Sequence, residues 1–354
     1  MLNKWHSALV ATLVAVATGS IAAESIAAGT SGGSSDIKIG YAVPVLANPY
    51  WETNVQFAKQ MASALGVSLI VESANDQADT QLQNVENLAA QGVKGIVFGP
   101  IDTRIGPAIL KVCQQHNIVC AAAERRPGVE PNDSNKGYFA GYVVGDDRDL
   151  GARIGQILDR AGARKCVAMS GIQGNSVADL RLQGFTTYAE SHGMAVLSTF
   201  RPAELAADGQ KATENFLAQL PGPKFDCAFG FDGDVGTGAI SALSKAGVLN
   251  KVKVATIGPT SSNIGELKSG QMLASIGGEF MDGGFATIMV YDAMRGHRAT
   301  SGAVVLHGVT VLRSNVARYA AQFGGNPVTG YDAKQLSATY NPRATTAGFM
   351  VKLK

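Results

Sequence analysis

The feature that most constrains the fold of this chain is a repeated alternation of short apolar runs with segments of helical periodicity. Ile37 to Val43 alternates as a β-strand does, and the apolar residues of the next segment, Val55 to Leu65, recur at helical spacing. Gly95 to Gly99 is a short run without a polar side chain, as in strands that are buried on both faces. Strands that alternate with helices in this way predict parallel sheets with helices on both faces.

The alternation runs through the chain twice, which predicts two doubly wound, parallel-sheet α/β domains. Single glycines stand where helices should end, as at Gly66, Gly92 and Gly247, and glycine is the usual residue just past a helix. The expected strands are residues 37–43, 67–71, 95–99, 118–122, 138–144, 166–170, 196–200, 226–230, 252–257, 273–276 and 304–312. We assign residues to a first domain (37–145 plus 279–308), a second domain (146–278 plus 309–330) and a C-terminal extension (331–354).

The first residues have the pattern of a secretory signal peptide. Lys4 and His6 form a basic start, residues 8–17 are an uncharged and largely apolar run, and small residues follow. A membrane anchor is the alternative, but the run is far shorter than the ~20 residues that cross a bilayer. We therefore expect a signal peptide at residues 1–27, a flexible leader at residues 28–36, and export to the periplasm of a mature chain that is not inserted in the membrane.

Four cysteines, Cys113, Cys120, Cys166 and Cys227, gain the chance to form disulfide bonds if the chain is exported. Their spacing differs from that of a zinc site, in which paired cysteines lie close together along the chain. Cys166 and Cys227 each lie near the start of an expected strand and could be neighbours. A bond between them and a pair of buried thiols both remain open.

Charge and motifs exclude several classes of protein. The chain carries 30 basic and 28 acidic residues, so no basic surplus marks a nucleic-acid-binding protein. No phosphate-binding loop is present, no Gly-x-Ser-x-Gly elbow joins an expected strand to an expected helix, and the five histidines lack metal-ligand spacing. We therefore expect no enzymatic activity, no cofactor and no bound metal.

Polar and aromatic side chains follow the ends of several expected strands. Asn48, Tyr50 and Trp51 follow the first strand, and Glu124 and Arg125 follow the fourth. Ligands of parallel α/β sheets bind beyond the carboxyl ends of the strands, so two facing sheets would surround one cleft. The residues that we expect to contact a ligand are Asn48, Tyr50, Trp51, Asp102, Glu124, Arg125, Asp179, Arg181, Phe231, Asp232 and Glu279.

Several of these residues also have a structural interpretation. Trp51 could pack on the core, and Asp102 and Asp232 could cap helices. Asp179 and Arg181 could pair with each other as an exposed salt bridge. The set nevertheless suits a polyhydroxylated ligand, because aromatic rings cover apolar faces, arginine offers a rigid fork of donors, and carboxylates accept hydroxyl protons.

The order and spacing of these loops, together with the signal segment, resemble the ribose-type family of periplasmic sugar-binding proteins. The resemblance covers about residues 37 to 312. It implies the type I periplasmic-binding fold, which the effector domain of the lactose-repressor family shares. It also implies that the chain is the substrate-binding component of an ABC sugar transporter.

The first domain matches the sugar-contacting positions of that family well. An asparagine and aromatic residues after the first strand contact the sugar there, and Asn48, Tyr50 and Trp51 match those positions. An Asp-Arg pair after the fourth strand binds ring hydroxyls, and the matching pair here is Glu124-Arg125.

The second domain departs more from the family pattern. Asp179 stands where the family has an arginine, and Asp232 stands where it has an asparagine. A family aspartate corresponds to Gly258, and a glutamine near a hinge corresponds to Gly278, which Glu279 follows. The resemblance therefore implies the fold and the class of protein rather than ribose itself, and the carboxylates could also favour an amine-bearing ligand.

The resemblance implies a mechanism and partners as well. We expect a monomer that captures a small polar ligand, a sugar or polyol, by hinge closure and delivers it to an ABC-type permease in the inner membrane. The chain would cross between the domains near residues 145–147, 277–279 and 308–310, where glycines could absorb changes in backbone angle. The alternative is a periplasmic sensor, with a sugar or another ligand, that reports to a chemoreceptor or membrane kinase. Carboxylates in the cleft leave glycoside hydrolysis as a lesser alternative.

Overall fold

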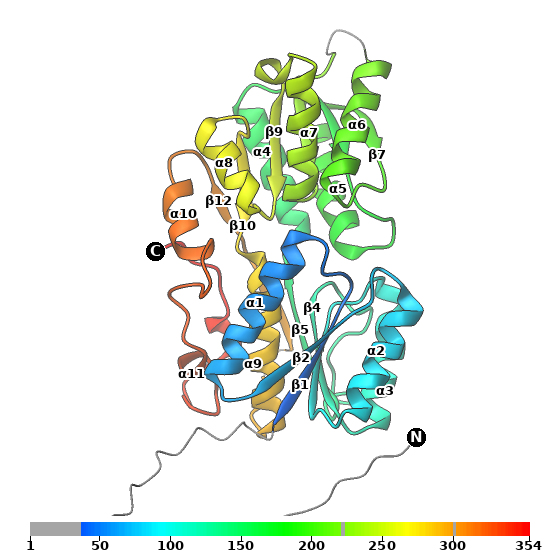
Figure 1. The fold of residues 1–354 in the computed structure, drawn as a ribbon, viewed down its shortest axis with the longest axis vertical. Coiled ribbons are helices and arrows are strands. Elements are labelled where there is room, and N and C mark those ends of the chain that lie inside the picture. The colour runs from blue at the N-terminus through cyan, green and yellow to red at the C-terminus, as the bar shows by residue number, and fades with distance from the viewer. Residues whose placement is uncertain (1–36, 221–223, 300–301) are drawn as a thin grey trace, which may run out of the picture. The chain divides into compact units, whose positions relative to one another are not determined.

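The first sheet consists of six parallel strands. A computed structural model describes residues 37–220, 224–299 and 302–354 (Figure 1), so the expected signal peptide and leader lie outside the described residues. The strands are β1 (Lys38–Val43), β2 (Ser68–Ser73), β3 (Gly95–Phe98), β4 (Val119–Glu124), β5 (Phe139–Gly145) and β11 (Ala303–Leu306). Their spatial order is β11-β5-β4-β3-β1-β2, and all the pairings are parallel.

Helices cover both faces of the first sheet, as the sequence predicted. α1 (Pro49–Ala64) and α9 (Asp282–Met294) pack against each other on one face, and α2 (Ala78–Ala90) and α3 (Gly106–Gln115) lie together on the other (Figure 1). Alternate residues of β1 belong to two separate hydrophobic clusters. This alternation explains the double covering, because successive side chains of a strand point to opposite faces of its sheet.

The second sheet repeats this arrangement with one antiparallel strand at its edge. Its strands are β6 (Lys165–Met169), β7 (Ala195–Phe200), β8 (Cys227–Gly230), β9 (Lys253–Ile257), β10 (Ala274–Gly277) and β12 (Val309–Val311). Their spatial order is β12-β10-β9-β8-β6-β7, and only the pairing of β10 with β12 is antiparallel.

Paired helices also cover the second sheet. The closest pairs are α4 (Asp147–Arg160) with α5 (Ser176–Ser191), and α6 (Ala206–Gln219) with α7 (Gly233–Lys245). α8 (Ser261–Ser269) packs beside α7 and has only two buried residues, so its apolar pattern is weak. The two α/β domains of the prediction are therefore present.

One expected strand, residues 304–312, is wrong as a single element. The structure divides it into β11, which joins the first sheet, and β12, which joins the second. Gly308 lies between them, close to the backbone of Gly277, where a β-carbon would lie 3.2 Å from the Gly277 carbonyl oxygen. The chain passes from one sheet to the other here, between β5 and α4, and between β10 and α9. The domain boundaries assigned from the sequence remain a prediction.

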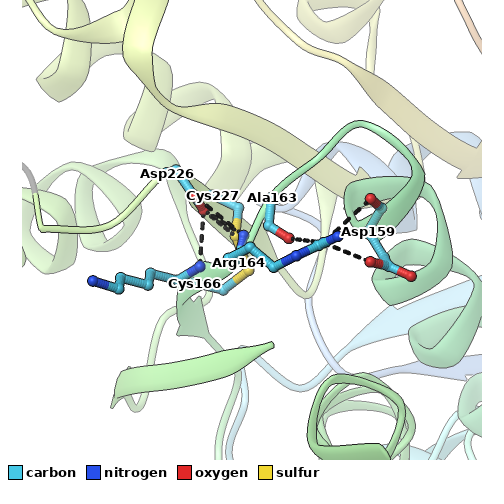
Figure 2. Close-up of a disulfide and its surroundings, with 7 residues drawn as sticks. Asp159, Ala163, Arg164, Cys166, Asp226 and Cys227 are labelled. Carbon is cyan, nitrogen blue, oxygen red and sulfur yellow. Dashed lines mark hydrogen bonds and ion pairs between the residues drawn. A yellow bond between two sulfur atoms is a disulfide. The ribbon is translucent and has the colours of Figure 1, made fainter. Parts of the chain in front are cut away.

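Both pairs of cysteines form disulfide bonds. Cys166 and Cys227 are register partners on the adjacent strands β6 and β8, with Cα atoms 4.5 Å apart (Figure 2). Beside them the carboxylate of Asp226 accepts hydrogen bonds from the backbone N–H groups of Arg164 and Lys165. The second bond, Cys113–Cys120, links α3 to β4 and was not anticipated from the sequence.

The C-terminal segment packs on the first domain after α10 (Val316–Phe323). Gln60 of α1 exchanges two hydrogen bonds with the backbone of Val328, and Phe349 stacks on Phe285 of α9 with ring centroids 5.0 Å apart. The segment includes the short helix α11 (Ala333–Leu336). The segment therefore packs on the face of the first sheet that α1 and α9 cover. None of the helices among the described residues has the length and apolar character that crossing a bilayer requires.

Candidate ligand-binding site

A cavity of about 140 Å³ lies where loops from the carboxyl ends of the two sheets meet. The first domain contributes the loops after β1, β2 and β4, and the second contributes the loops after β7 and β8 and part of α5. Its lining from the first domain is Val45, Ala47, Asn48, Tyr50, Trp51, Asp76, Glu124 and Arg125. Its lining from the second domain is Val177, Arg181, Glu204, Leu205, Asp208, Phe231 and Asp232.

Asn48 connects the two sides of the cavity. Its side-chain oxygen accepts a hydrogen bond from the N–H of Tyr50 at 2.8 Å, which caps α1, and Pro49 follows at the first helical position. Its amide nitrogen donates to the carboxylate of Asp232 at 3.3 Å and to the carbonyl of Glu204 at 3.2 Å. The local Asn-Pro motif thus holds in place a residue that bridges the domains.

Tyr50 and Trp51 both line the cavity, but each has a structural role as well. Trp51 is 2% exposed and belongs to the hydrophobic core, while the guanidinium of Arg125 lies over its ring, 5.6 Å from the centroid. Tyr50 packs edge-on against Trp51 and donates its hydroxyl to Asp282 at 3.1 Å. Burial raises the pKa of Tyr50 well above its usual value, so the phenol is neutral and acts as a donor.

The Glu124-Arg125 pair stands on an unusual turn at the end of β4. Glu124 has a φ of 64°, and the N–H of Arg125 donates to the carbonyl of Ala123 at 2.7 Å, which is a γ-turn. A positive φ is costly for a residue other than glycine, and such strain concentrates at functional sites. Glu124 and Arg125 form an ion pair with a 2.7 Å separation, and both side chains are buried. Burial raises the pKa of Glu124, and the charge of Arg125 opposes this.

Arg181 is the arginine that the second domain contributes to the cavity lining. It pairs with Asp147 of α4 at 2.9 Å, and both side chains are 4% exposed. A further N–H donates to the carbonyl of Phe231 at 2.9 Å. Burial raises the pKa of Asp147 to about 7, although the charge of Arg181 acts in the opposite direction. The predicted alternative of an exposed pair between Asp179 and Arg181 is therefore wrong, because Arg181 is buried and bound to a different carboxylate.

Asp232 is both a helix cap and a cavity residue. Its carboxylate accepts a hydrogen bond from the N–H of Val235 at 2.9 Å, at the start of α7. Burial raises its pKa to about 7, the hydrogen bond from Val235 lowers it, and the nearby charge of Glu204 raises it again. The two interpretations of Asp232 from the sequence are therefore compatible.

Three predicted residues do not line the cavity. Asp102 caps the 3-10 turn Thr103–Ile105 and is bound by the exposed side chain of Arg104. Asp179 pairs with Arg201 at 2.6 Å. Glu279 is 1% exposed in the turn before α9, and neither of its oxygens has a hydrogen-bond partner among the described residues. Burial raises the pKa of Glu279 to about 7, while Arg181 lowers it.

Three acidic residues of the lining were missed by sequence analysis: Asp76, Glu204 and Asp208. Asp76 follows β2 with a φ of 58°, and Glu204 follows the edge strand β7. Glu204 accepts a hydrogen bond from the N–H of Ile172 at 2.6 Å, and Asp208 accepts from the N–H groups of Glu204 and Leu205. The rule that ligands bind at strand ends applies to these two strands as well and would have identified both loops.

One group of possible metal ligands occurs among the described residues, and it lies outside the cavity. Asp146, Asp149 and His307 each place one ligand atom within 4.8 Å of the others, near two of the crossings between the sheets. His307 is exposed and the two carboxylates are partly exposed. Exposed acidic groups of this kind are common without an ion.

Known proteins share this fold and sequence pattern. The chain is 28% identical to the ribose import binding protein RbsB of Haemophilus influenzae, over 70% of this chain and 82% of that protein. It is 24% identical to the D-xylose-binding periplasmic protein of Escherichia coli, over 62% and 66%. An ABC transporter solute-binding protein from Agrobacterium vitis superposes with a TM-score of 0.73 at 21% identity, over 81% and 98%. The family described as periplasmic binding protein domain matches residues 39–298, and this chain belongs to that family.

Proposed function

We propose that this chain is a periplasmic solute-binding protein that captures a sugar or polyol between its two domains and delivers it to an ABC-type permease. The observation that carries the proposal is the cavity at the strand ends, where each domain presents an arginine that is already paired with a carboxylate. The transport role is supported by the relatives, which include a ribose import binding protein and a xylose-binding periplasmic protein. These relatives do not favour the sensor alternative.

The paired arginines suit a ligand that both donates and accepts hydrogen bonds. A sugar hydroxyl donates one proton and accepts through its lone pairs, so it can bind a carboxylate and a guanidinium at once. Glu124 and Arg125 are adjacent and line the same wall. Within the part of the chain that the structure describes, the Oε2 and Nε atoms of their ion pair have no hydrogen-bond partner beyond each other. Buried polar atoms are normally hydrogen-bonded, so a polar ligand would complete this arrangement.

Aromatic side chains supply the apolar part of the lining. Trp51 and Tyr50 lie on the first wall and Phe231 lies on the second. Such rings cover the C–H faces of a sugar while the polar groups around them fix its hydroxyls. The lining thus combines the two kinds of surface that a monosaccharide presents.

Residues that bridge the two domains support a mechanism in which the domains close around the ligand. The hydrogen bonds from Asn48 to Asp232 and to the Glu204 carbonyl join the two walls directly. A ligand that contacts both walls would add to these bonds only in the closed arrangement, so it would shift the population toward closure. Three chain crossings between the sheets would serve as the hinge.

Calorimetric titration and small-angle scattering test the proposal. The protein should bind at least one member of a panel of pentoses, hexoses and polyols, and its radius of gyration should fall on binding.

Three variants test the assigned site. Arg125→Ala should abolish binding of the best ligand. Trp51→Phe should weaken this binding, and phenylalanine fills most of the core space that alanine would leave empty. Asn48→Ser keeps a helix cap but removes the bridge, so it should weaken ligand binding by about tenfold with little change in stability. Unchanged binding in all three variants would contradict the assigned site.

A further inference from the structure

The cavity lining is strongly acidic. Five carboxyl groups line it, from Asp76, Glu124, Glu204, Asp208 and Asp232, against two guanidinium groups, from Arg125 and Arg181. Both guanidinium groups are already engaged, since Arg125 pairs with Glu124, and Arg181 pairs with Asp147 outside the lining. The ion pairs among the described residues therefore leave four of the five carboxylates of the cavity without an ion-pair partner.

Asp232 and Glu204 are two of these uncompensated carboxylates, and both lie on the second wall. They come from neighbouring loops on the second wall, and Asn48 contacts both residues at once, the Asp232 carboxylate and the Glu204 carbonyl. Neither carboxylate forms an ion pair with any described residue. Burial raises the pKa of each, and the charge of Glu204 raises the pKa of Asp232 further. Two acidic residues thus line the same wall of the cavity, with Asp232 buried and Glu204 half-buried.

A compensating cation in the ligand would relieve this repulsion. A buried carboxylate is stabilised when it is both hydrogen-bonded and paired with an opposite charge. A protonated primary amine offers three N–H donors and one positive charge, which suits two carboxylates that each keep free lone pairs. A neutral hydroxyl offers a single proton and no charge, so it meets this demand less well.

The arrangement does not suit a metal ion. No three carboxylates of the lining bring ligand atoms within 4.8 Å of one another, since the one such group among the described residues is Asp146, Asp149 and His307. A divalent cation needs a compact shell of oxygen ligands. Carboxylates that are spread along a cavity with two arginines and three aromatic rings fit an extended organic molecule better.

We propose that the ligand of this cavity is a sugar or polyol that carries a protonated primary amine, with the amine bound between Asp232 and Glu204. This inference rests on the proposed function and narrows its ligand class. The hydroxyls would face Glu124, Arg125 and Arg181, and the carbon skeleton would lie against the aromatic rings.

The test is a set of matched titrations at pH 7.5. Glucosamine, galactosamine and 1-amino-1-deoxysorbitol are each compared with the corresponding hydroxyl compound, glucose, galactose or sorbitol, and the two N-acetylated amino sugars serve as neutral controls. We expect the best amine to bind at least tenfold more tightly than its hydroxyl counterpart and its N-acetyl form. Asp232→Asn and Glu204→Gln should each remove most of this preference, because they delete a charge and keep the shape. Asp179→Asn, which makes the same change outside the cavity, should leave the preference intact.

The outcomes separate the two proposals. If a neutral sugar or polyol binds as tightly as its amine counterpart or more tightly, the amine inference is overturned and the proposed function stands. An amine preference that survives both Asp232→Asn and Glu204→Gln also overturns the inference. If no compound of either series binds to the folded protein, both proposals lose their support. Because asparagine also caps helices well, Asp232→Asn should fold, and Glu204→Gln provides a second variant that leaves the cap untouched.

Discussion

The two walls of the cavity are built in different ways. On the first wall the polar groups come from short stretches of sequence, since Asn48 caps the helix that Tyr50 and Trp51 begin, and Glu124 pairs with its neighbour Arg125. On the second wall the partners are distant, since Arg181 binds Asp147 on another helix and Phe231 on another loop. The first wall is therefore assembled locally, whereas the second is assembled by tertiary packing.

The largest expected effect comes from breaking the buried ion pair of the second wall. Arg181→Met should lower the free energy of unfolding of the unliganded protein by about 3–5 kcal/mol, because Asp147 is left buried without a partner. Arg125→Met should lower it by only about 1.5–3 kcal/mol, because Glu124 lines the cavity and can turn toward water there. Urea denaturation monitored by circular dichroism measures both values. Equal losses would mean that the two walls do not differ in this way, and the double variant Arg181→Met/Asp147→Leu should recover part of the loss.

The disulfides offer a second comparison of the domains. Cys166–Cys227 closes a chain segment with a sequence separation of 61, whereas Cys113–Cys120 closes one of 7. In the chain-entropy account, replacing both cysteines by alanine should cost about 4 kcal/mol for the first pair and about 2.5 kcal/mol for the second. Thermal unfolding of the two double variants, with the oxidised parent as control, measures the difference. A larger loss for the Cys113/Cys120 variant would contradict the prediction.

The third prediction concerns pH. Burial raises the pKa values of Asp147, Asp232 and Glu279 to about 7 in the folded protein. Between pH 4 and 7 the folded state then binds more protons than the unfolded state, so stability should fall as pH rises through this window and level off above it. The melting temperature of the unliganded protein should therefore be higher at pH 5 than at pH 8.

Variants that replace a single carboxyl group by an uncharged amide sharpen this test. Asp232→Asn and Glu279→Gln should each flatten the pH dependence of the melting temperature, since each removes one of the titrating groups. Asp179→Asn, at a partly exposed pair outside the cavity, serves as a control for the substitution itself. A melting temperature that rises from pH 5 to pH 8 in the parent protein would refute the assignment of raised pKa values.

Much of the fold could be predicted because its signals are local. Periodicity and helix-ending glycines identified the two series of strands and helices, and the strand-end rule placed Asn48, Arg125 and Asp232 at one cavity. The split of residues 304–312 was not visible in the sequence, because both halves have the same strand-like pattern and only their partners differ. The Cys113–Cys120 bond was also missed, since nothing in the spacing shows that the helix and the next strand bring the sulfur atoms together.

The sequence by itself determined the class of the fold, the family and most of the first wall, because each depends on residues that are neighbours along the chain. Tertiary structure alone decided which acidic groups share the cavity, that Arg181 binds Asp147 rather than Asp179, and that Glu204 lies beside Asp232. The physical reason is that charge pairing and burial depend on distances in space. Segments far apart in the sequence set those distances only when the two sheets have formed and their loops meet.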